Sequence, residues 1–234
     1  MENPEFTFHL ITPTDYEKSL TLFWNHFMPY EPTTQLAGCC TRPGYRIYNL
    51  DTMLRKMLCS QTCYMAKNKD GNIVGVVFCH IIDKNKPFVY HSEKEYLQQG
   101  WPRDFIPVLL LLDQLCHHQN ILKSKNVDRF IDIFAVVVNT NYRRRGLASQ
   151  LITKTLDEAQ ASNMPLATIS CTSFFTQRCS LKLGFTAEKT IAYKDWNWEK
   201  RNFLFTPYIQ TLFYLQNIYQ QKTNYTYFKR FVNY

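Results

Sequence analysis

The chain has 234 residues, of which 45% are hydrophobic and 15% aromatic, with only 7 glycines, a composition that excludes a disordered or fibrous protein. The net charge is +8, but the basic residues are scattered and interrupted by acids, which is compatible with a polyanionic ligand and does not require nucleic acid. We expect a single domain over residues 1–234, in which the Tyr- and Gln-rich tail 217–234 is either an extra element or mobile.

The first half of the chain predicts a strand, two helices and a hairpin. Residues 6–11 (FTFHLI) alternate in polarity as a strand does, and Thr12 followed by a proline predicts the start of a helix. A second amphipathic helix is predicted over about 46–58. Between these helices the segment MPYEPTTQLAG places a proline on either side of Glu31 and is expected to be irregular. Residues 62–82 predict two strands joined by the turn NKDG.

The second half alternates strands with helices. Residues 83–104 predict a loop or an inserted lid, followed by a helix over 105–123 and the strand RFIDIFAVVV. The remaining predicted elements are a helix in LASQLITKTLDEAQAS, a strand in LATISCTS, a short helix in FFTQRCSLKLGF ended by Gly184, and strands in TAEKTIAY and FLFTPYIQTLFYL. This order, with hairpins at both ends, predicts an α/β sheet that is not purely parallel.

Targeting signals and cysteine spacing bear on the compartment. The N-terminal residues MENPEFTFHL lack the apolar segment of a signal peptide, and the longest apolar run, 105–112, is too short to span a bilayer. The 8 cysteines are irregularly spaced without a CxxC pair, which favours free thiols over disulfides. We therefore expect a cytoplasmic protein that does not associate with membranes. We also expect a monomer.

The segment 139–149, NTNYRRRGLAS, carries the clearest sign of chemistry. It follows an apolar strand and precedes an amphipathic helix, so unpaired backbone N–H groups at the helix start would form an anion site. Gly146 would let a phosphate approach the backbone, Ala148 is small, and the preceding arginines add positive charge. The alternatives are a basic solvated turn and a nuclear-localisation patch.

In this context RRRGLA resembles the R-x-x-G-x-A acyl-CoA pyrophosphate loop of the GNAT N-acetyltransferases. The flanking segments KDGNIVGVV and ATISCTSFFTQRCSLKLGFTAE are similar to the GNAT hairpin and to its terminal strand and helix. The likeness is strongest to the insect arylalkylamine (dopamine-type) N-acetyltransferases, because residues 142–146 (YRRRG) stand at the place of their YRGRG motif and Glu31-Pro32 at the place of their EP motif. The resemblance covers about residues 5–215. It implies a GNAT α/β fold, with a mixed, mostly antiparallel twisted sheet of about seven strands flanked by helices.

The resemblance also implies the reaction. Acetyl-CoA would donate an acetyl group to the primary amine of a small arylalkylamine, of the dopamine, tyramine or serotonin class, by direct attack in a ternary complex, leaving CoA as product. No metal or nucleic acid would take part. The residues implied to bind acetyl-CoA are Val136, Val137, Val138, Arg143, Arg144, Arg145, Gly146, Leu147, Ala148 and Ser149.

Catalytic residues are also implied by the resemblance. An alkylamine has a pKa of about 10, so a base must remove its proton, and the EP motif assigns this role to Glu31. Thr172 and Thr176 stand where the insect enzymes carry two serines, and Ser180 stands where many GNATs carry a tyrosine acid. The rings expected to contact the acceptor are those of Tyr30, Tyr45 and Phe174.

Several alternatives stay open. Glu31 could instead be a solvated loop acid. The acceptor could be a polyamine or a protein or peptide lysine, or the chain could bind CoA with lost or altered catalysis. An acyl intermediate on Cys171 is disfavoured because no histidine is positioned by sequence to activate it. The motif Cys-His-His at 116–118 offers adjacent ligands, only part of which can face one metal, so no metal is expected.

Overall fold

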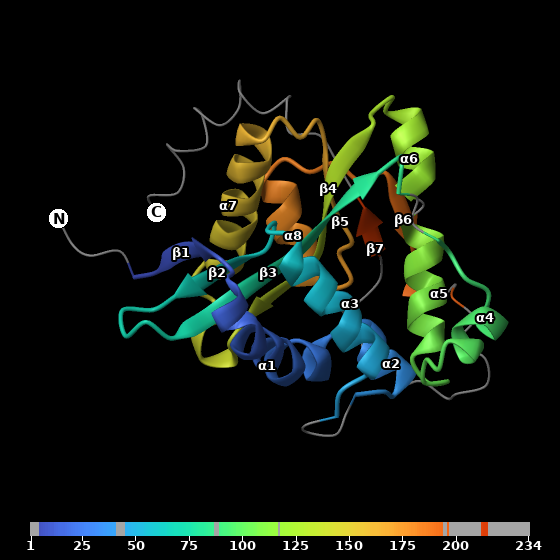
Figure 1. The fold of residues 1–234 in the computed structure, drawn as a ribbon, viewed down its shortest axis with the longest axis horizontal. Coiled ribbons are helices and arrows are strands. Elements are labelled where there is room, and N and C mark those ends of the chain that lie inside the picture. Colours follow the sequence, from blue (N-terminus) through green and yellow to red (C-terminus); the bar gives the residue numbers. More distant parts are fainter. Residues whose placement is uncertain are drawn as a thin grey trace.

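A five-stranded sheet forms the centre of the computed structural model, which describes residues 5–40, 45–86, 89–116, 118–193, 196 and 212–214 (Figure 1). The strand order is β1-β2-β3-β4-β5; the first three junctions are antiparallel and the β4–β5 junction is parallel. The strands are β1 (Thr7–Leu10), β2 (Tyr64–Lys67), β3 (Ile73–Asp83), β4 (Arg129–Val138) and β5 (Ala167–Ile169). The predicted mixed, mostly antiparallel sheet is confirmed.

Two further strands, β6 (Lys189–Ile191) and β7 (Leu212–Tyr214), pair antiparallel with each other and form a separate sheet. The strands described therefore number seven, close to the prediction, but they are divided between two sheets. Residues 203–211, part of the last predicted strand, lie outside the described residues. The tail 217–234 lies outside them as well.

Helices cover the two faces of the central sheet (Figure 1). On one face the buried side chains of Leu147, Leu151 and Ile152 in α7 pack in one cluster with those of the strands. A Cβ at Gly75 in β3 would lie 2.9 Å from Leu151 Cδ1, so glycine permits the close approach of α7 to the sheet. Replacing Gly75 by a residue with a Cβ would overpack this contact, which costs about 1–3 kcal/mol. On the opposite face α1 and α3 contribute to a second cluster with Phe78 of β3.

The helices agree in outline with the sequence prediction. The α-helices are α1 (Tyr16–His26), α2 (Pro32–Ala37), α3 (Tyr48–Cys59), α4 (Glu93–Gln98), α5 (Ile106–Leu115), α6 (His118–Ser124), α7 (Leu147–Ala161) and α8 (Phe174–Lys182). Short 3-10 helices are η1 (Pro13–Asp15), η2 (Met28–Tyr30) and η3 (Thr140–Tyr142). In the described residues, none of these helices combines the length and the apolar character that crossing a bilayer demands.

The segment around Glu31, expected to be irregular, forms η2 and α2 instead. Glu31 is the N-cap of α2, where its Oε2 accepts the Thr34 N–H at 2.8 Å, and Pro32 occupies the first helical position. Both residue types favour a helix start, so the second proline begins a helix where we expected it to break one.

The predicted loop 83–104 contains α4, begun by a capping box in which Ser92 N–H donates to Glu95 Oε2 at 2.7 Å. The Ser-x-x-Glu spacing is its sequence signal. The predicted helix 105–123 is two helices, because the chain leaves helical geometry at Cys116 (φ −95°, ψ 30°). The Tyr90 hydroxyl serves both freed backbone groups at this break: it accepts the His118 N–H at 2.6 Å and donates to Cys116 O at 2.8 Å.

Candidate active site

The central sheet opens between β4 and β5. The two strands pair only from Ile131 to Ile133 of β4, although β4 continues to Val138. Phe134 has no partner in β3, because Ile133 pairs with Cys79 and Ala135 pairs with Phe78, so Phe134 forms a bulge. Bulges re-aim the residues that follow them in a strand.

Beyond the bulge, the backbone groups of alternate β4 residues face the open side. Asn139 N–H donates to Val74 O of β3 at 2.9 Å. Because successive strand residues direct their backbone groups to opposite neighbours, Val137 also faces β3, whereas Val136 and Val138 direct theirs toward the split. The side chain of Val137 is buried. Two backbone positions are thus available to an extended ligand lying along β4.

The turn after β4 leads into the start of α7. Arg144 (φ 64°) and Gly146 (φ 71°) both have left-handed backbone angles. Gln150 N–H donates to Gly146 O at 3.1 Å as the first helical bond, so the N–H groups of residues 147–149 have no acceptor within the helix. The nearest atom to a Cβ at Gly146 is Gln150 Nε2 at 3.8 Å, so the backbone angle, not space, requires glycine.

The three arginines of this turn differ in their contacts. Arg143 donates to His26 O at 2.8 Å and lies over the Tyr30 ring, 4.5 Å from its centroid. Arg145 donates to Glu5 Oε1 at 2.8 Å, an exposed pair of the kind that contributes little to stability. Arg144 is exposed and has no ion pair or hydrogen bond within the described residues. Only Arg144 therefore has its whole guanidinium available to an anion.

The first turn of α7 is fixed to its surroundings. Leu147 is buried in the core under the sheet, and Ala148 is half-buried. Ser149 Oγ lies 3.0 Å from Cys179 Sγ of α8, which connects the two helices. The helix start is therefore anchored to the core and to α8.

A cavity of about 450 Å³ borders the split. Val136 of β4 and Ile169 of β5 both line it, as do Glu31, Thr172 and Thr176. The structure thus brings the three predicted catalytic residues together at one cavity beside the β4–β5 opening. They come from segments far apart in the chain: the start of α2, the segment after β5, and α8.

Glu31 lies in the wall of this cavity with 5% of its surface exposed. Its Oε2 accepts hydrogen bonds from Thr34 N–H and from the Thr33 hydroxyl. Its buried Oε1 has no hydrogen-bond partner among the described residues. The N-cap contacts therefore fix the carboxylate and leave one oxygen able to accept a proton or a water.

The two threonines lie near hydroxyl groups. Thr176 Oγ1 is 2.8 Å from Ser173 Oγ, the N-cap of α8. The carbonyl of Thr172 accepts the Tyr193 hydroxyl at 2.9 Å. Burial raises the pKa of Tyr193 well above its usual value, and the charge of Glu31 adds to this shift. Tyr193 therefore stays neutral and able to donate its proton in a hydrogen bond at neutral pH.

The residues expected to contact the acceptor are not those that line the cavity. Tyr30, Tyr45 and Phe174 are 52%, 40% and 45% exposed, and none of them lines it. Tyr30 lies under Arg143, and Phe174 lies under the Arg178 guanidinium, 5.5 Å from the ring centroid. The aromatic rings that do line the cavity are Phe23, Phe27, Tyr48, Tyr90, Tyr96, Trp101, Phe105 and Phe134.

Sequence reasoning missed a polar cluster in the cavity wall, formed by His80, His118 and Asp132. Asp132 Oδ2 is 3.0 Å from His80 Nε2, and Asp132 Oδ1 accepts the Thr168 hydroxyl at 2.5 Å. Burial acts to raise the pKa of Asp132, but its contacts with His118 and His80 outweigh burial and hold the pKa well below its usual range. An aspartate inside the apolar strand RFIDIFAVVV was the available signal.

Cys171 and Ser180 form a buried pair, with Sγ and Oγ 3.3 Å apart. Burial raises the pKa of the Cys171 thiol to about 12. A thiol that stays protonated at neutral pH is a poor nucleophile, in agreement with the expectation that no acyl-cysteine forms. Ser180 contacts this thiol and does not line the cavity.

Together, a bulged β4 that diverges from β5 and a glycine turn into an open helix start define an N-acetyltransferase with the fold that binds acetyl-CoA. The chain belongs to the Acetyltransferase (GNAT) family, whose sequence pattern matches residues 26–185.

Solved structures of this fold include insect enzymes. Arylalkylamine N-acetyltransferase 2 from Aedes aegypti is 25% identical with a TM-score of 0.81, over 92% of this chain and 100% of that one. Polyamine N-acetyltransferase from Drosophila melanogaster, which forms N-acetylagmatine, is 19% identical with a TM-score of 0.73, over 90% and 98% of the two chains. A mosquito arylalkylamine N-acetyltransferase like 5b is 15% identical with a TM-score of 0.72, over 89% and 97%. The resemblance to insect arylalkylamine N-acetyltransferases is confirmed.

Proposed function

We propose that the protein transfers an acetyl group from acetyl-CoA to the primary amine of a small arylalkylamine, by direct attack in a ternary complex. The observation that carries this proposal is the position of Glu31. Its carboxylate is buried in an aromatic-lined cavity beside the β4–β5 split, with one oxygen unpartnered among the described residues. A base in such a position can reach an amine that approaches along the cavity.

The β4–α7 region would hold acetyl-CoA, which supplies the activated acetyl group and a thiolate leaving group. In this proposal the backbone of Val136 and Val138 binds the pantetheine arm, and the N–H groups at the start of α7 bind the pyrophosphate. Gly146 shapes the turn, and Arg144 adds a free positive charge. The open N–H groups and the glycine angle support this fit.

Glu31 would remove the proton from the acceptor. A primary alkylamine with a pKa of about 10 is almost wholly protonated at neutral pH and cannot attack a thioester in that form. In this proposal Glu31 Oε1 accepts the proton, directly or through a water, while Oε2 stays bonded to Thr33 and Thr34. Because the N-cap contacts hold the carboxylate in place, little reorganisation is needed during proton transfer.

Thr172 and Thr176 would complete the polar end of the cavity. A threonine hydroxyl can both accept and donate a proton, so either can orient the amine or pass a proton toward the departing thiolate. Ser173 Oγ lies 2.8 Å from Thr176 Oγ1, so a proton held by Thr176 could pass to a second hydroxyl. The additional methyl groups, relative to serine, narrow this end and restrict the acceptor's shape.

The cavity supports a small aromatic acceptor. A volume of about 450 Å³ falls in the range of small-molecule sites. Phe27 and Tyr48 lie in the wall, and rings of this kind stack against an aryl group or attract an ammonium. In this proposal these rings take the place of Tyr30, Tyr45 and Phe174 as acceptor contacts.

A second candidate is a dicationic amine such as agmatine or a polyamine. Its support is Asp113, a carboxyl group in the same cavity wall that accepts the Tyr96 hydroxyl at 2.5 Å. A second carboxyl group beyond Glu31 could pair with a second cation. Burial raises the pKa of Asp113, which weakens this candidate because the acid then carries less negative charge.

The setting of the reaction follows the sequence expectations and is part of the proposal. We propose one domain over residues 1–234, acting as a cytoplasmic monomer without nucleic acid or membrane. The contacts of Arg143 and Arg145 with other parts of the protein support the view that the arginine run is not a nucleic-acid surface.

The test is CoA-thiol release by the purified chain from acetyl-CoA with tyramine, dopamine, serotonin, agmatine, spermidine and a lysine peptide. We expect the highest kcat/KM with an arylalkylamine. A preference for agmatine or spermidine would select the second candidate. If acetyl-CoA raises the Tm while no acceptor is turned over, the proposed activity is wrong.

A further inference from the structure

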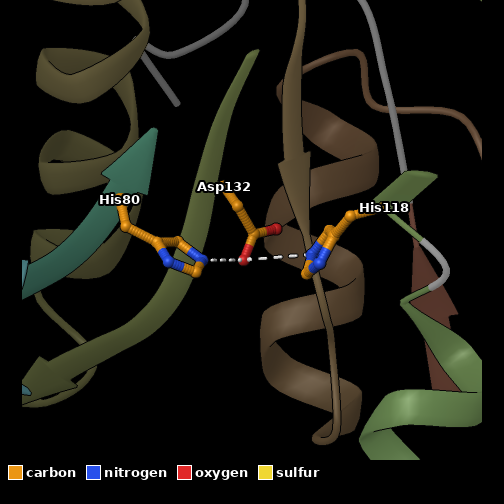
Figure 2. Close-up of side chains that lie close together, drawn as sticks. All are labelled: His80, His118 and Asp132. Carbon is orange, nitrogen blue, oxygen red and sulfur yellow. Dashed lines mark hydrogen bonds and ion pairs between the residues drawn. The ribbon is translucent and has the colours of Figure 1, made fainter. Parts of the chain in front are cut away.

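The cluster of His80, Asp132 and His118 holds two imidazoles against one carboxylate at the cavity wall (Figure 2). His80 and Asp132 are opposite each other on β3 and β4, and His118 comes from the start of α6. Figure 2 shows the Asp132 carboxylate between the two rings. One potential ligand atom from each residue lies within 4.8 Å of the other two.

The distances from Asp132 to the two histidines are close to those of a metal site. A tetrahedral Zn²⁺ with ligand bonds of about 2.0–2.1 Å separates its ligand atoms by about 3.3 Å. Asp132 Oδ2 is 3.0 Å from His80 Nε2 and 3.8 Å from His118 Nε2, values on either side of that separation. The candidate ligand atoms of all three residues lie within 4.8 Å of one another, so an ion would bind all three once the side chains close to that separation.

The surroundings of the cluster fix its ligand atoms. Asp132 Oδ1 accepts the Thr168 hydroxyl at 2.5 Å, which orients the carboxylate. The Tyr90 hydroxyl fixes the backbone of His118, and the His118 ring stacks on that of Tyr90, with centroids 6.3 Å apart. Contacts of this kind, one shell out from the ligands, orient the donors in metal sites.

We propose that His80, His118 and Asp132 form a binding site for a divalent transition-metal ion of the zinc class. Two imidazole nitrogens and one carboxylate oxygen favour Zn²⁺ or Co²⁺ over Mg²⁺ and Ca²⁺, which prefer all-oxygen ligands. This inference departs from the sequence expectation of no metal, because the pairing of β3 with β4 places His80 opposite Asp132, and folding brings both to His118, which lies between them in the sequence. The site is distinct from Glu31 and the threonines, and its ion takes no part in acetyl transfer.

The ion would leave a coordination position open to the cavity, since all three residues line it. Three protein ligands and one open position are typical of zinc sites that exchange water or small molecules. A bound dication also adds positive charge to a cavity proposed to receive an ammonium. The site would therefore act as an inhibitory metal site for the acceptor.

The first test is titration of the tag-free full chain with Co²⁺, monitored by visible absorption. The second is equilibrium dialysis of the same chain against Zn²⁺. We expect one equivalent per chain and the intense visible bands of four-coordinate Co²⁺. Substituting His118→Ala or His80→Ala should each weaken binding at least tenfold, whereas His9→Ala, an exposed histidine on β1, should leave it unchanged. Circular dichroism establishes that each variant is folded.

Two results would overturn the proposal. One is absence of stoichiometric binding by the unmodified chain, as an ion-free hydrogen-bonded His–Asp–His cluster predicts. The other is loss of binding in Cys59→Ser, since Cys59 is an exposed thiol and an alternative ligand. His80 is less buried than His118, so His80→Ala remains informative if His118→Ala fails to fold.

Discussion

The proposed acetyl-CoA side and the proposed acceptor side of this protein are built in different ways. On the acetyl-CoA side, one continuous segment from β4 through the glycine turn to α7 supplies backbone groups in fixed directions. On the acceptor side, side chains from many separate elements meet at one cavity: α1, α2, α3, β3, α4, α5, α6, β4, β5 and α8. A site made of backbone depends on a few φ and ψ angles, whereas a site made of side chains depends on how the whole fold packs.

This difference teaches which changes should matter where. Side-chain substitutions in the β4–α7 turn should matter less than changes in its backbone angle or charge. Substitutions in the cavity should alter the acceptor reaction and leave acetyl-CoA binding intact.

The largest expected effect is on the acetyl-CoA side. Gly146→Asp introduces a side chain at φ 71° and a negative charge at the anion site. We expect the Kd for acetyl-CoA to rise at least 100-fold, about 2.7 kcal/mol, by isothermal titration calorimetry. Gly146→Asn is the matched control, because Asn tolerates this backbone angle and carries no charge. If the Kd of Gly146→Asp for acetyl-CoA stays within threefold of that of the unmodified chain, the turn is not part of the acetyl-CoA site.

A smaller effect should separate the two sides through the proposed metal site. One equivalent of Zn²⁺ should raise the KM for the amine about tenfold, roughly 1.4 kcal/mol, and should change the KM for acetyl-CoA less than twofold. The response should disappear in His118→Ala. Steady-state kinetics with each substrate varied in turn measures both constants. A rise confined to the KM for acetyl-CoA would place the ion at the acetyl-CoA side and contradict the proposed inhibition of acceptor binding.

The smallest effect concerns the arginines. Arg144→Ala should weaken acetyl-CoA binding about three- to tenfold, and more at low salt, because its guanidinium is exposed and without an ion pair in the described part of the chain. Arg143→Ala should change acetyl-CoA binding less than twofold and lower the free energy of unfolding by about 0.5–1 kcal/mol, through loss of the Tyr30 contact. Calorimetry and urea denaturation measure the two quantities. A larger loss of binding in Arg143→Ala would reverse this assignment.

The same difference explains what the sequence could predict. The strand at 129–138 and the helix from Leu147 lie where the polarity pattern places them, and the glycine turn between them is a local motif. Glu31, Thr172 and Thr176 could be named only through the resemblance, because no local pattern indicates that they share a cavity.

The acceptor side was predicted less well, for physical reasons. His80, His118 and Asp132 have no common spacing, and only the pairing of β3 with β4 and the break before α6 bring them together. Tyr30 stood next to Glu31 in the sequence, but its ring turns outward beneath Arg143. Residues adjacent in sequence therefore need not face the same cavity.

The most direct test of the central claim is CoA-thiol release by Glu31→Gln with the best arylalkylamine. Glutamine can still accept the Thr34 N–H at the helix start but cannot take a proton from the amine. We predict a loss of about 100-fold in kcat/KM, roughly 2.7 kcal/mol, while the Kd for acetyl-CoA stays within twofold. A kcat/KM within threefold of the unmodified chain would contradict the assignment of Glu31 as the base.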